Sequence, residues 1–243
     1  MATVLILGAT SDIGVALAKK FASEKFDVVL AARKPEQLKP LESDIEIRYG
    51  VKCSSQFFDA LQYDTHFEFF NALNPKPEIS ICVFGILVDE LLAFEDWKLC
   101  AQMINTNYTG AVSILNVIAA EYMSRKKGTI IGISSVAGDR GRASKLIYAS
   151  SKAAFSVYLS GLRNMCYKYH VHVMTVQPGF VYTKMTENQP LPKAITSTPA
   201  EVASVIYKAY LKKKNLIYVK WFWRYIMLVI QSIPEFMFKK MKL

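Results

Sequence analysis

The stretch TVLILGATSDIG, residues 3–14, decides the fold of this 243-residue chain. Its first half is a nearly continuous apolar run that ends in glycine, which is typical of a buried parallel strand. A helix is predicted over residues 13–25, because its apolar residues share one face, and DVVLAA at 27–32 predicts the next strand. The stretch therefore begins a βαβ unit.

The same alternation continues along the chain. Further strands are predicted at 51–58, 79–84, 128–133, 171–176 and 215–219. Helices are predicted at 35–49, with a break before Pro40, and at 65–73, 98–124, 147–169 and 199–211. Seven strands that alternate with helices predict the α/β class, with a doubly wound seven-stranded parallel sheet of the Rossmann type.

Composition restricts the classes of function. Hydrophobic residues make up 52% of the chain, which is enough for one complete core. The four cysteines show no CxxC pair or zinc-like spacing, and no signal peptide precedes the first strand, so we expect a reducing cytoplasm. The three histidines form no ligand pattern, so we expect no metal site.

The net charge of +10 is concentrated near the C-terminus, since residues 207–243 carry +8 of it. A basic region of this kind indicates nucleic acid or an anionic membrane as partner. Residues 215–233, NLIYVKWFWRYIMLVIQSI, place their aromatic side chains in an aliphatic run and not along a basic groove. This arrangement argues against nucleic acid.

The same segment is too short and too charged to span a bilayer, but it suits a membrane interface. Lys220, Arg224 and Gln231 fall on one polar stripe at helical spacing. Headgroup-like positions are predicted for Trp221, Phe222, Trp223 and Tyr225. We therefore expect an amphipathic helical extension that makes peripheral membrane contact through residues 216–240. The alternative is a substrate lid or subunit contact folded onto the domain.

The turn GATSDIG at 8–14 predicts a nucleotide site. Gly8 and Gly14 bracket a turn from strand to helix whose N–H groups and positive helix end can hold a pyrophosphate. Asp12 stands where the pattern usually has a middle glycine, so a turn without a ligand remains the alternative. We expect residues 1–214 to form the nucleotide-binding and catalytic domain, and 215–243 to add the last strand and the helical extension.

Two residues bear on the kind of dinucleotide. The second strand is followed by Arg33, where NAD-binding folds usually carry an acid for the ribose 2′-hydroxyl. A cation at this position suits a 2′-phosphate, although a solvated surface charge is the alternative. Asp59, which follows the third strand, is predicted to accept a hydrogen bond from an adenine amino group.

A tyrosine and a lysine in IYASSKAAF, residues 147–155, predict acid–base chemistry. Tyr148 and Lys152 are four residues apart and share one face of a helix. An ammonium group nearby favours the phenolate, so we expect the pKa of Tyr148 to be lowered. Ser135, after the fifth strand, can bind the same substrate oxygen.

With these motifs in place, the chain resembles the short-chain dehydrogenase/reductases over essentially its whole length. The resemblance implies that Ser135, Tyr148 and Lys152 are catalytic and that Asn107, in NTNYTG, holds a water of the proton relay. QPGFVYT at 177–183 is similar to the family's segment at the nicotinamide. The cofactor-binding residues that follow are Gly8, Thr10, Ser11, Ile13, Gly14, Arg33, Asp59, Gly85, Tyr148, Lys152, Pro178, Gly179 and Thr183.

Two departures from the family pattern point to a branch. VFG at 83–85 replaces an Asn-Ala-Gly triplet, and Asp12 replaces a glycine. Together with TNYTGAVS, SSVAGDRGR and RYIMLVIQSIPEFMFKK, they resemble the reductases of decaprenylphosphoryl-2-keto-erythro-pentose, which complete the formation of lipid-linked arabinose for cell wall biosynthesis. This resemblance implies a keto-sugar on a polyprenyl phosphate as the substrate.

We therefore expect an NADP(H)-dependent reductase, with NAD(H) as the alternative cofactor, that acts at the inner face of the cell membrane. One alternative is a reductase of a steroid, fatty or other apolar ketone. Another is a nucleotide-binding membrane scaffold without turnover. The expected partners are a flavin-dependent oxidase that makes the ketone and a second copy of the chain, bound through the helices at 98–124 and 147–169.

Overall fold

The computed structural model describes residues 1–187 and 190–241. Its single sheet has seven parallel strands in the order β3-β2-β1-β4-β5-β6-β7, which confirms the predicted doubly wound topology. The strands are β1 (Thr3–Leu7), β2 (Asp27–Ala32), β3 (Cys53–Phe57), β4 (Ile79–Cys82), β5 (Gly128–Ile133), β6 (Val171–Pro178) and β7 (Leu216–Val219).

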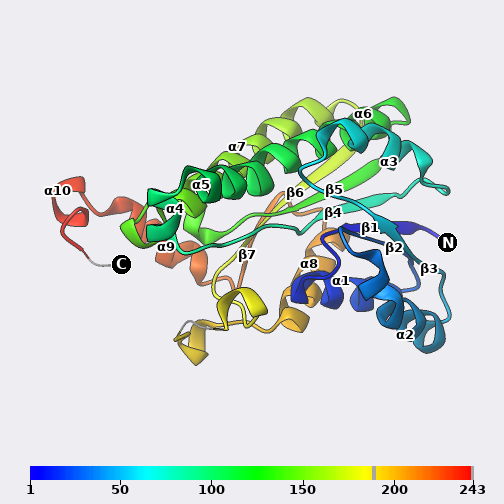
Figure 1. Ribbon diagram of the computed structural model, residues 1–243, viewed down its shortest axis with the longest axis horizontal. Coiled ribbons are helices and arrows are strands. Elements are labelled where there is room, and N and C mark those ends of the chain that lie inside the picture. The colour runs from blue at the N-terminus through cyan, green and yellow to red at the C-terminus, as the bar shows by residue number, and fades with distance from the viewer. Residues whose placement is uncertain (188–189, 242–243) are drawn as a thin grey trace.

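Helices cover both faces of the sheet (Figure 1). They are α1 (Asp12–Ser23), α2 (Lys39–Tyr49), α3 (His66–Ala72), α4 (Glu90–Glu95), α5 (Trp97–Ile104), α6 (Gly110–Ser124), α7 (Leu146–Tyr167), α8 (Pro199–Leu211), α9 (Trp223–Ser232) and α10 (Glu235–Phe238). On one face lie α3, α6 and α7, and on the other lie α1, α2 and α8 (Figure 1).

Strand β1 is apolar from Val4 to Leu7 because helices cover both of its faces. Val4 and Ile6 belong to the core beneath α1, α2 and α8, whereas Leu5 and Leu7 belong to the core beneath α3, α6 and α7. All four side chains are fully buried. A strand with both faces covered cannot alternate apolar and polar residues.

Two predicted helices differ from the observed ones. The helix expected at 98–124 is divided, because a π-helical turn at Asn105–Thr109 separates α5 from α6, and the short α4 that precedes them was not predicted. The helix expected at 35–49 consists of a 3₁₀ turn, Pro35–Leu38, followed by α2 from Lys39, so the change lies one residue before the break expected at Pro40. Helical periodicity persists through such turns, so the pattern of apolar residues cannot reveal them.

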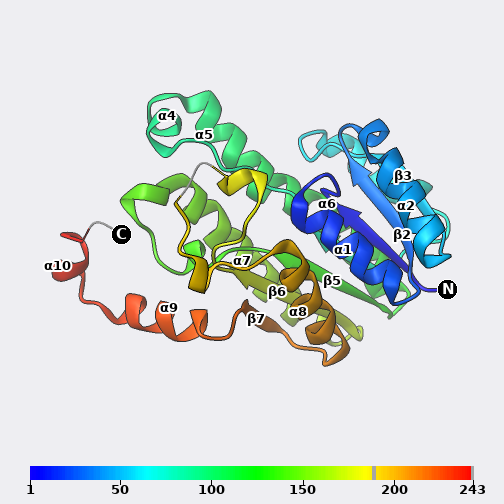
Figure 2. The same cartoon turned by 90° about the horizontal axis from the view of Figure 1, so that it is seen from below.

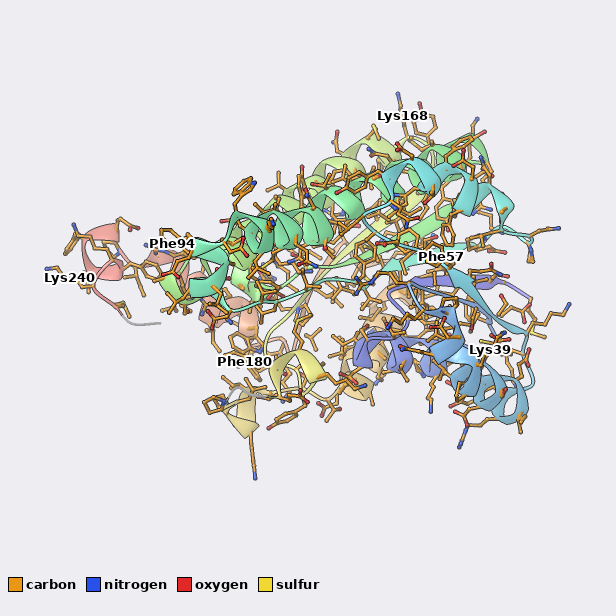
Figure 3. All side chains as sticks on the ribbon, in the orientation of Figure 1. Lys39, Phe57, Phe94, Lys168, Phe180 and Lys240 are labelled. Atoms are coloured by element: carbon orange, nitrogen blue, oxygen red, sulfur yellow. The ribbon has the colours of Figure 1, made fainter. Side chains whose placement is uncertain are left out.

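Beyond β7, the chain follows the sheet edge to the end of the molecule opposite the N-terminus (Figure 2). Lys240 in this segment and Phe94 in α4 lie at that same end (Figure 3). Within the part of the chain that the structure describes, no helix combines the length and apolarity needed to cross a membrane.

Helix α9 presents two different apolar faces. Trp223 and Met227 are buried against Val136 and neighbouring residues, so the expectation that Trp223 lies at a headgroup position is wrong. Other large apolar side chains of α9 and of the residues on either side of it are exposed: Trp221, Tyr225, Leu228, Val229, Phe236, Met237 and Met241.

Two of the three residues of the polar stripe predicted for the C-terminal segment bind the domain, so the stripe does not form one solvent-facing surface. Lys220 Nζ donates to the carbonyl oxygen of Thr196 at 2.7 Å, and Gln231 Nε2 donates to that of Asp139 at 3.0 Å. Only Arg224 of the stripe makes no such contact with the domain in the described residues. The segment therefore docks partly through polar groups and leaves apolar side chains outside.

Candidate active site

The glycine turn is packed too tightly for any other residue. Gly8 has φ +97°, and a Cβ built on it would lie 2.6 Å from the backbone nitrogen of Phe84. A Cβ on Gly14 would lie 2.6 Å from the carbonyl oxygen of Gly8. Ser11 closes the turn, because its hydroxyl donates to Gly8 O at 2.8 Å and accepts from Gly14 N at 3.0 Å. The N-terminus of α1 thereby opens onto a cavity.

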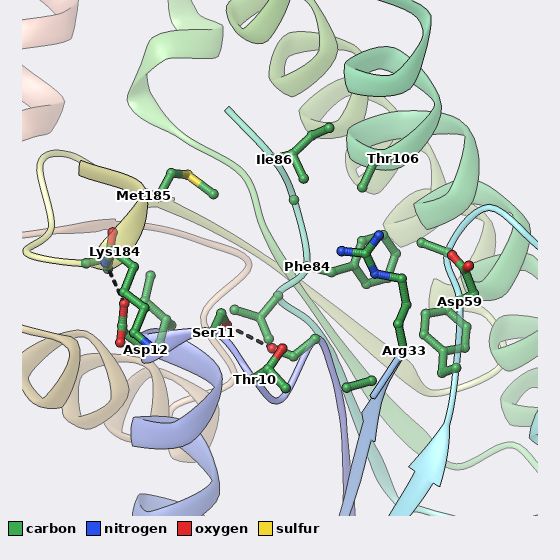
Figure 4. Close-up of a pocket in the computed structure, with 18 of the residues that line it drawn as sticks. Thr10, Ser11, Asp12, Arg33, Asp59, Phe84, Ile86, Thr106, Lys184 and Met185 are labelled. Carbon is green, nitrogen blue, oxygen red and sulfur yellow. Dashed lines mark hydrogen bonds between the residues drawn. The ribbon is translucent and has the colours of Figure 1, made fainter. Parts of the chain in front are cut away.

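That cavity has a volume of about 340 Å³ and contains most of the residues predicted to bind the cofactor. Figure 4 shows Arg33 and Asp59 on one side of it and Asp12 and Lys184 on the opposite side. The predicted residues that line it are Gly8, Thr10, Ser11, Ile13, Arg33, Asp59, Gly85 and Thr183. Phe58, Phe84, Ile86, Gln102, Thr106 and Met185 also line it and were not predicted.

Arg33 and Asp59 differ in how they are held. Arg33 is exposed, and its guanidinium makes no hydrogen bond or salt bridge with the described residues, which leaves it free for an anion. Asp59 Oδ1 accepts from the N–H of Leu61 at 3.0 Å, so one carboxylate oxygen is fixed within its own turn. Both residues lie at the carboxyl end of the sheet, as expected for a dinucleotide crevice.

A second cavity, of about 110 Å³, brings together Ser135, Tyr148 and Lys152. Pro178 and Gly179 line it as well. The two cavities share the lining residues Ile13, Val83, Gly85, Thr183 and Met185. One continuous cleft therefore joins the glycine turn to the predicted catalytic residues, along the carboxyl ends of the strands.

Burial shifts the pKa of the two central groups, Tyr148 and Lys152. It raises the pKa of Tyr148, and an interaction with the Ser135 hydroxyl acts in the opposite direction. The expectation that Lys152 lowers the pKa of Tyr148 is therefore wrong for this structure. Burial also lowers the pKa of the Lys152 ammonium to about 8, and Lys152 Nζ donates to the carbonyl oxygen of Ile133 at 3.1 Å.

Asn107 is buried in the π-helical turn, and both polar atoms of its side chain form hydrogen bonds. Its Oδ1 accepts from Ile86 N at 2.7 Å, while its Nδ2 donates to Ile86 O at 2.9 Å and to Ser151 Oγ at 3.2 Å. A Cβ on Gly85 would lie 3.0 Å from Asn107 Oδ1 and 3.3 Å from Lys152 Nζ. The glycine thus lets the cleft floor approach both side chains, and Asn107 joins that floor to α7.

Comparisons with known proteins agree with this arrangement. The sequence profile described as short chain dehydrogenase matches residues 2–193. This protein belongs to the short-chain dehydrogenase family. An uncharacterized oxidoreductase of Mycobacterium tuberculosis is 29% identical over 99% of this chain and 97% of its own length. A 3-oxoacyl-[acyl-carrier-protein] reductase of Aquifex aeolicus is 28% identical over 83% of this chain and 87% of its own.

Among solved structures, a short-chain dehydrogenase from Sphingobium yanoikuyae in complex with NADPH shares the fold. Its TM-score is 0.84 at 20% identity, with 97% of each chain covered. At this identity the likeness concerns the fold alone. Within residues 1–187 and 190–241, no group of three or more His, Cys, Asp or Glu side chains could hold a metal ion.

In this short-chain dehydrogenase, Asp12 has a role that its sequence position did not reveal. Its Oδ2 accepts from the N–H of Lys184 at 2.7 Å, across 172 residues of chain. Lys184 belongs to the turn after β6 that carries Thr183 and Met185, both of which line the cleft. Where the family pattern has a glycine, the dehydrogenase therefore uses a carboxylate to fasten this turn to α1.

Gly179 and Phe180, in the segment that resembles the family's nicotinamide segment, contact Trp223 at the start of α9. A Cβ on Gly179 would overlap the indole of Trp223, and the Phe180 ring packs edge-on against that indole with centroids 5.4 Å apart. Gly179 also lines the second cavity. The C-terminal segment therefore packs against one wall of the cleft through Trp223.

Proposed function

We propose that this short-chain dehydrogenase is an NADP(H)-dependent reductase of a ketone, and that the cleft joining the glycine turn to Ser135, Tyr148 and Lys152 carries this function. When bound, the dinucleotide supplies a hydride to the carbonyl carbon. Tyr148 donates the proton to the carbonyl oxygen, and the Ser135 hydroxyl orients that oxygen. The product is an alcohol, with the hydride on carbon and the proton on oxygen.

Lys152 and Asn107 support the return of a proton to Tyr148. A buried amine with a pKa near 8 can release and regain a proton close to neutral pH. In the family that the chain resembles, the Asn107 position holds a water of this relay. We assign Asn107 the same role here, together with its observed contacts to Ile86 and Ser151.

NADP(H) is the preferred cofactor in this proposal, and NAD(H) is the alternative. The support is the position of Arg33, an unpaired guanidinium that lines the cavity where the family often carries an acid. In the same proposal, Asp59, which lines this cavity, accepts from the adenine amino group through its second oxygen. The NADPH-bound relative from Sphingobium yanoikuyae is consistent with this choice.

For the substrate we propose a keto-sugar on a polyprenyl phosphate, specifically a 2-keto-pentose of the kind that precedes lipid-linked arabinose. The motif resemblance carries this proposal. The exposed apolar side chains of the segment 215–243 support it, because a substrate with a polyprenyl chain stays in the membrane. On this reading, residues 216–240 make peripheral contact with the inner face of the cell membrane.

Two partners complete the proposal. A flavin-dependent oxidase would supply the ketone. A second copy of the chain would pair through α5, α6 and α7, a face on which Val157 and Tyr167 of α7 are exposed.

An apolar ketone, such as a steroid or a fatty acyl group, is the second candidate substrate. It is favoured by the apolar lining of the cleft and by the likeness to a 3-oxoacyl-[acyl-carrier-protein] reductase. A nucleotide-binding scaffold without turnover is the remaining alternative, but such a protein has no need for Ser135, Tyr148 and Lys152 in one cavity.

Oxidation of NADPH by the purified enzyme separates the three. The polyprenyl-phosphate-linked 2-keto-pentose in mixed micelles should be reduced at least ~100-fold more efficiently than a steroid ketone or a 3-oxoacyl thioester, a difference of about 2.7 kcal/mol. The reverse order would select the apolar-ketone alternative. No oxidation with any of them, despite NADPH binding, would support the scaffold.

A further inference from the structure

Helix α7, which carries Tyr148 and Lys152, does not cap its own N-terminus. Its N-cap residue, Lys145, makes no capping hydrogen bond through its side chain. The N–H groups of a first helical turn have no partner within the helix and need one from elsewhere.

Glu90, which begins α4, supplies this partner from a distant part of the chain. Its Oε2 accepts from the N–H of Ile147 at 2.9 Å, and its Oε1 accepts from the N–H of Tyr148 at 3.0 Å. One carboxylate therefore binds the backbone of the predicted proton donor and of the residue before it. Glu90 precedes Ile147 by 57 positions in the sequence and Tyr148 by 58.

The environment of Glu90 makes this contact significant. The residue is only 9% exposed, and it forms no salt bridge with any Lys or Arg in the described part of the chain. A buried carboxylate needs compensating partners. Here the partners are two N–H groups at the positive end of a 22-residue helix, a location that favours an anion.

The segment that leads to Glu90 is also joined to the cleft. Gly85 and Ile86, a few residues earlier, line the larger cavity. Ile86 exchanges two hydrogen bonds with Asn107, whose Nδ2 also donates to Ser151 on α7. Helix α7 is thus tied to this segment at its first turn, through Glu90, and one turn later, through Asn107.

We propose that Glu90 is a positioning residue for Tyr148: by holding the Tyr148 N–H, its carboxylate fixes the start of α7 and the place of the phenol beside Ser135 and the cleft floor. A loss of this contact leaves the helix intact beyond its first turn but lets that turn move. Proton transfer depends on such placement, whereas dinucleotide binding at the glycine turn does not.

The kinetic part of the test rests on the proposed reductase function. It compares Glu90→Ala and Glu90→Gln with a control, Asp96→Ala. Asp96 is a matched control because its Oδ1 accepts from the N–H of Lys98 at the start of α5, and among the described residues its carboxylate makes no hydrogen bond to α7. Glu90→Ala should lower kcat by ~10-fold or more and change KM for NADPH by less than ~2-fold, with Glu90→Gln between it and the native enzyme. Asp96→Ala should keep the native kcat.

A double-mutant cycle with Tyr148→Phe shows whether Glu90 acts through the tyrosine. In the Tyr148→Phe background, Glu90→Ala should cause no further loss of kcat, because the placed group is already absent. Equal, additive losses in both backgrounds would overturn the proposal, and so would an unchanged kcat in Glu90→Ala.

Amide hydrogen exchange of the peptide spanning residues 146–152 gives a readout that needs no substrate. Glu90→Ala should exchange in this peptide at least ~10-fold faster than the native protein, while α6 stays unchanged. Unaltered exchange would refute the contact. If Glu90→Ala does not fold, Glu90→Gln decides, because it keeps one acceptor oxygen. A native enzyme without turnover would refute the reductase function and leave the exchange result to judge Glu90.

Discussion

Arg140 and Ile230 are joined by a hydrogen bond of 2.7 Å from Nη1 of the arginine to the carbonyl oxygen, across 90 residues of chain. The same nitrogen donates to the carbonyls of Gln231 and Ile233, and Nη2 binds Glu235 at 2.9 Å. Arg140 lies in the loop that follows Ser135. The arginine therefore caps the carboxyl end of α9 and fastens the C-terminal segment to the loop that follows Ser135.

We expect Arg140→Ala to release this segment without unfolding the domain. The carbonyls at the end of α9 would lose a charged donor, so limited proteolysis should cleave within residues 224–241 several-fold faster. Arg48→Ala, which removes an exposed arginine of α2, serves as the control and should leave the cleavage rate unchanged. Equal protection of the segment in both variants would contradict the clamp.

Substitutions on the exposed face of α9 test the proposed membrane contact. Leu228→Glu with Val229→Glu should abolish binding to anionic vesicles, because both side chains are exposed and their replacement leaves the buried Trp223 and Met227 in place. Ile47→Glu, at an exposed apolar residue of α2, is the matched control. Sedimentation with vesicles at low and high salt is the measurement, and native protein that stays in the supernatant at low salt would remove the membrane from the proposal.

Tyr148→Phe should fold and bind cofactor but lose turnover. The phenyl ring keeps the packing while the proton donor is absent, so kcat should fall on the order of 10²-fold or more. Tyr158→Phe, on the same helix, removes only a hydroxyl that donates to Asn116 Oδ1 and should retain kcat. Single-turnover kinetics compare the two variants, and a native rate in Tyr148→Phe would end the assignment of the tyrosine as acid.

Arg33→Ala should weaken NADPH more than NADH. Because the guanidinium is exposed, we expect a difference of about 1–2 kcal/mol, near the low end for a charge-assisted contact. Lys34→Ala, at the neighbouring exposed residue, should weaken both cofactors equally or not at all. Titration of each cofactor by fluorescence measures the two dissociation constants, and equal losses in Arg33→Ala would show that the arginine does not read the 2′-phosphate.

Lys152 should make the protein more stable as the pH rises above about 8. Its pKa is about 8 in the folded state and 10.5 in the unfolded chain, so the unfolded state binds more protons between these values. The free energy of unfolding should therefore increase with pH in this window, by at most about 1.4 kcal/mol per pH unit. Denaturant unfolding of the native protein and of Lys152→Met at about pH 8 and about pH 10 isolates the effect. Parallel curves would mean that the ammonium is not buried in solution.

Local patterns were sufficient for the fold and for most of the cleft. The apolar run at 3–7 predicted a buried parallel strand, and the glycines at 8 and 14 predicted a turn from that strand into a helix. Tyr148 and Lys152 were paired by helical spacing alone. Each of these inferences depends on residues within a few positions of one another, where the backbone itself dictates the geometry.

The sequence by itself thus determined the α/β sheet, the tight glycine turn and three residues that meet in the second cavity, Ser135, Tyr148 and Lys152. The tertiary structure alone decided that burial raises the pKa of Tyr148, that Trp223 faces the domain, and that Glu90 caps α7. Burial and long-range hydrogen bonds depend on which distant segments meet. Glu90 and Ile147 are 57 positions apart in the sequence, and no local pattern indicates their contact. Only packing of the whole chain brings such groups together.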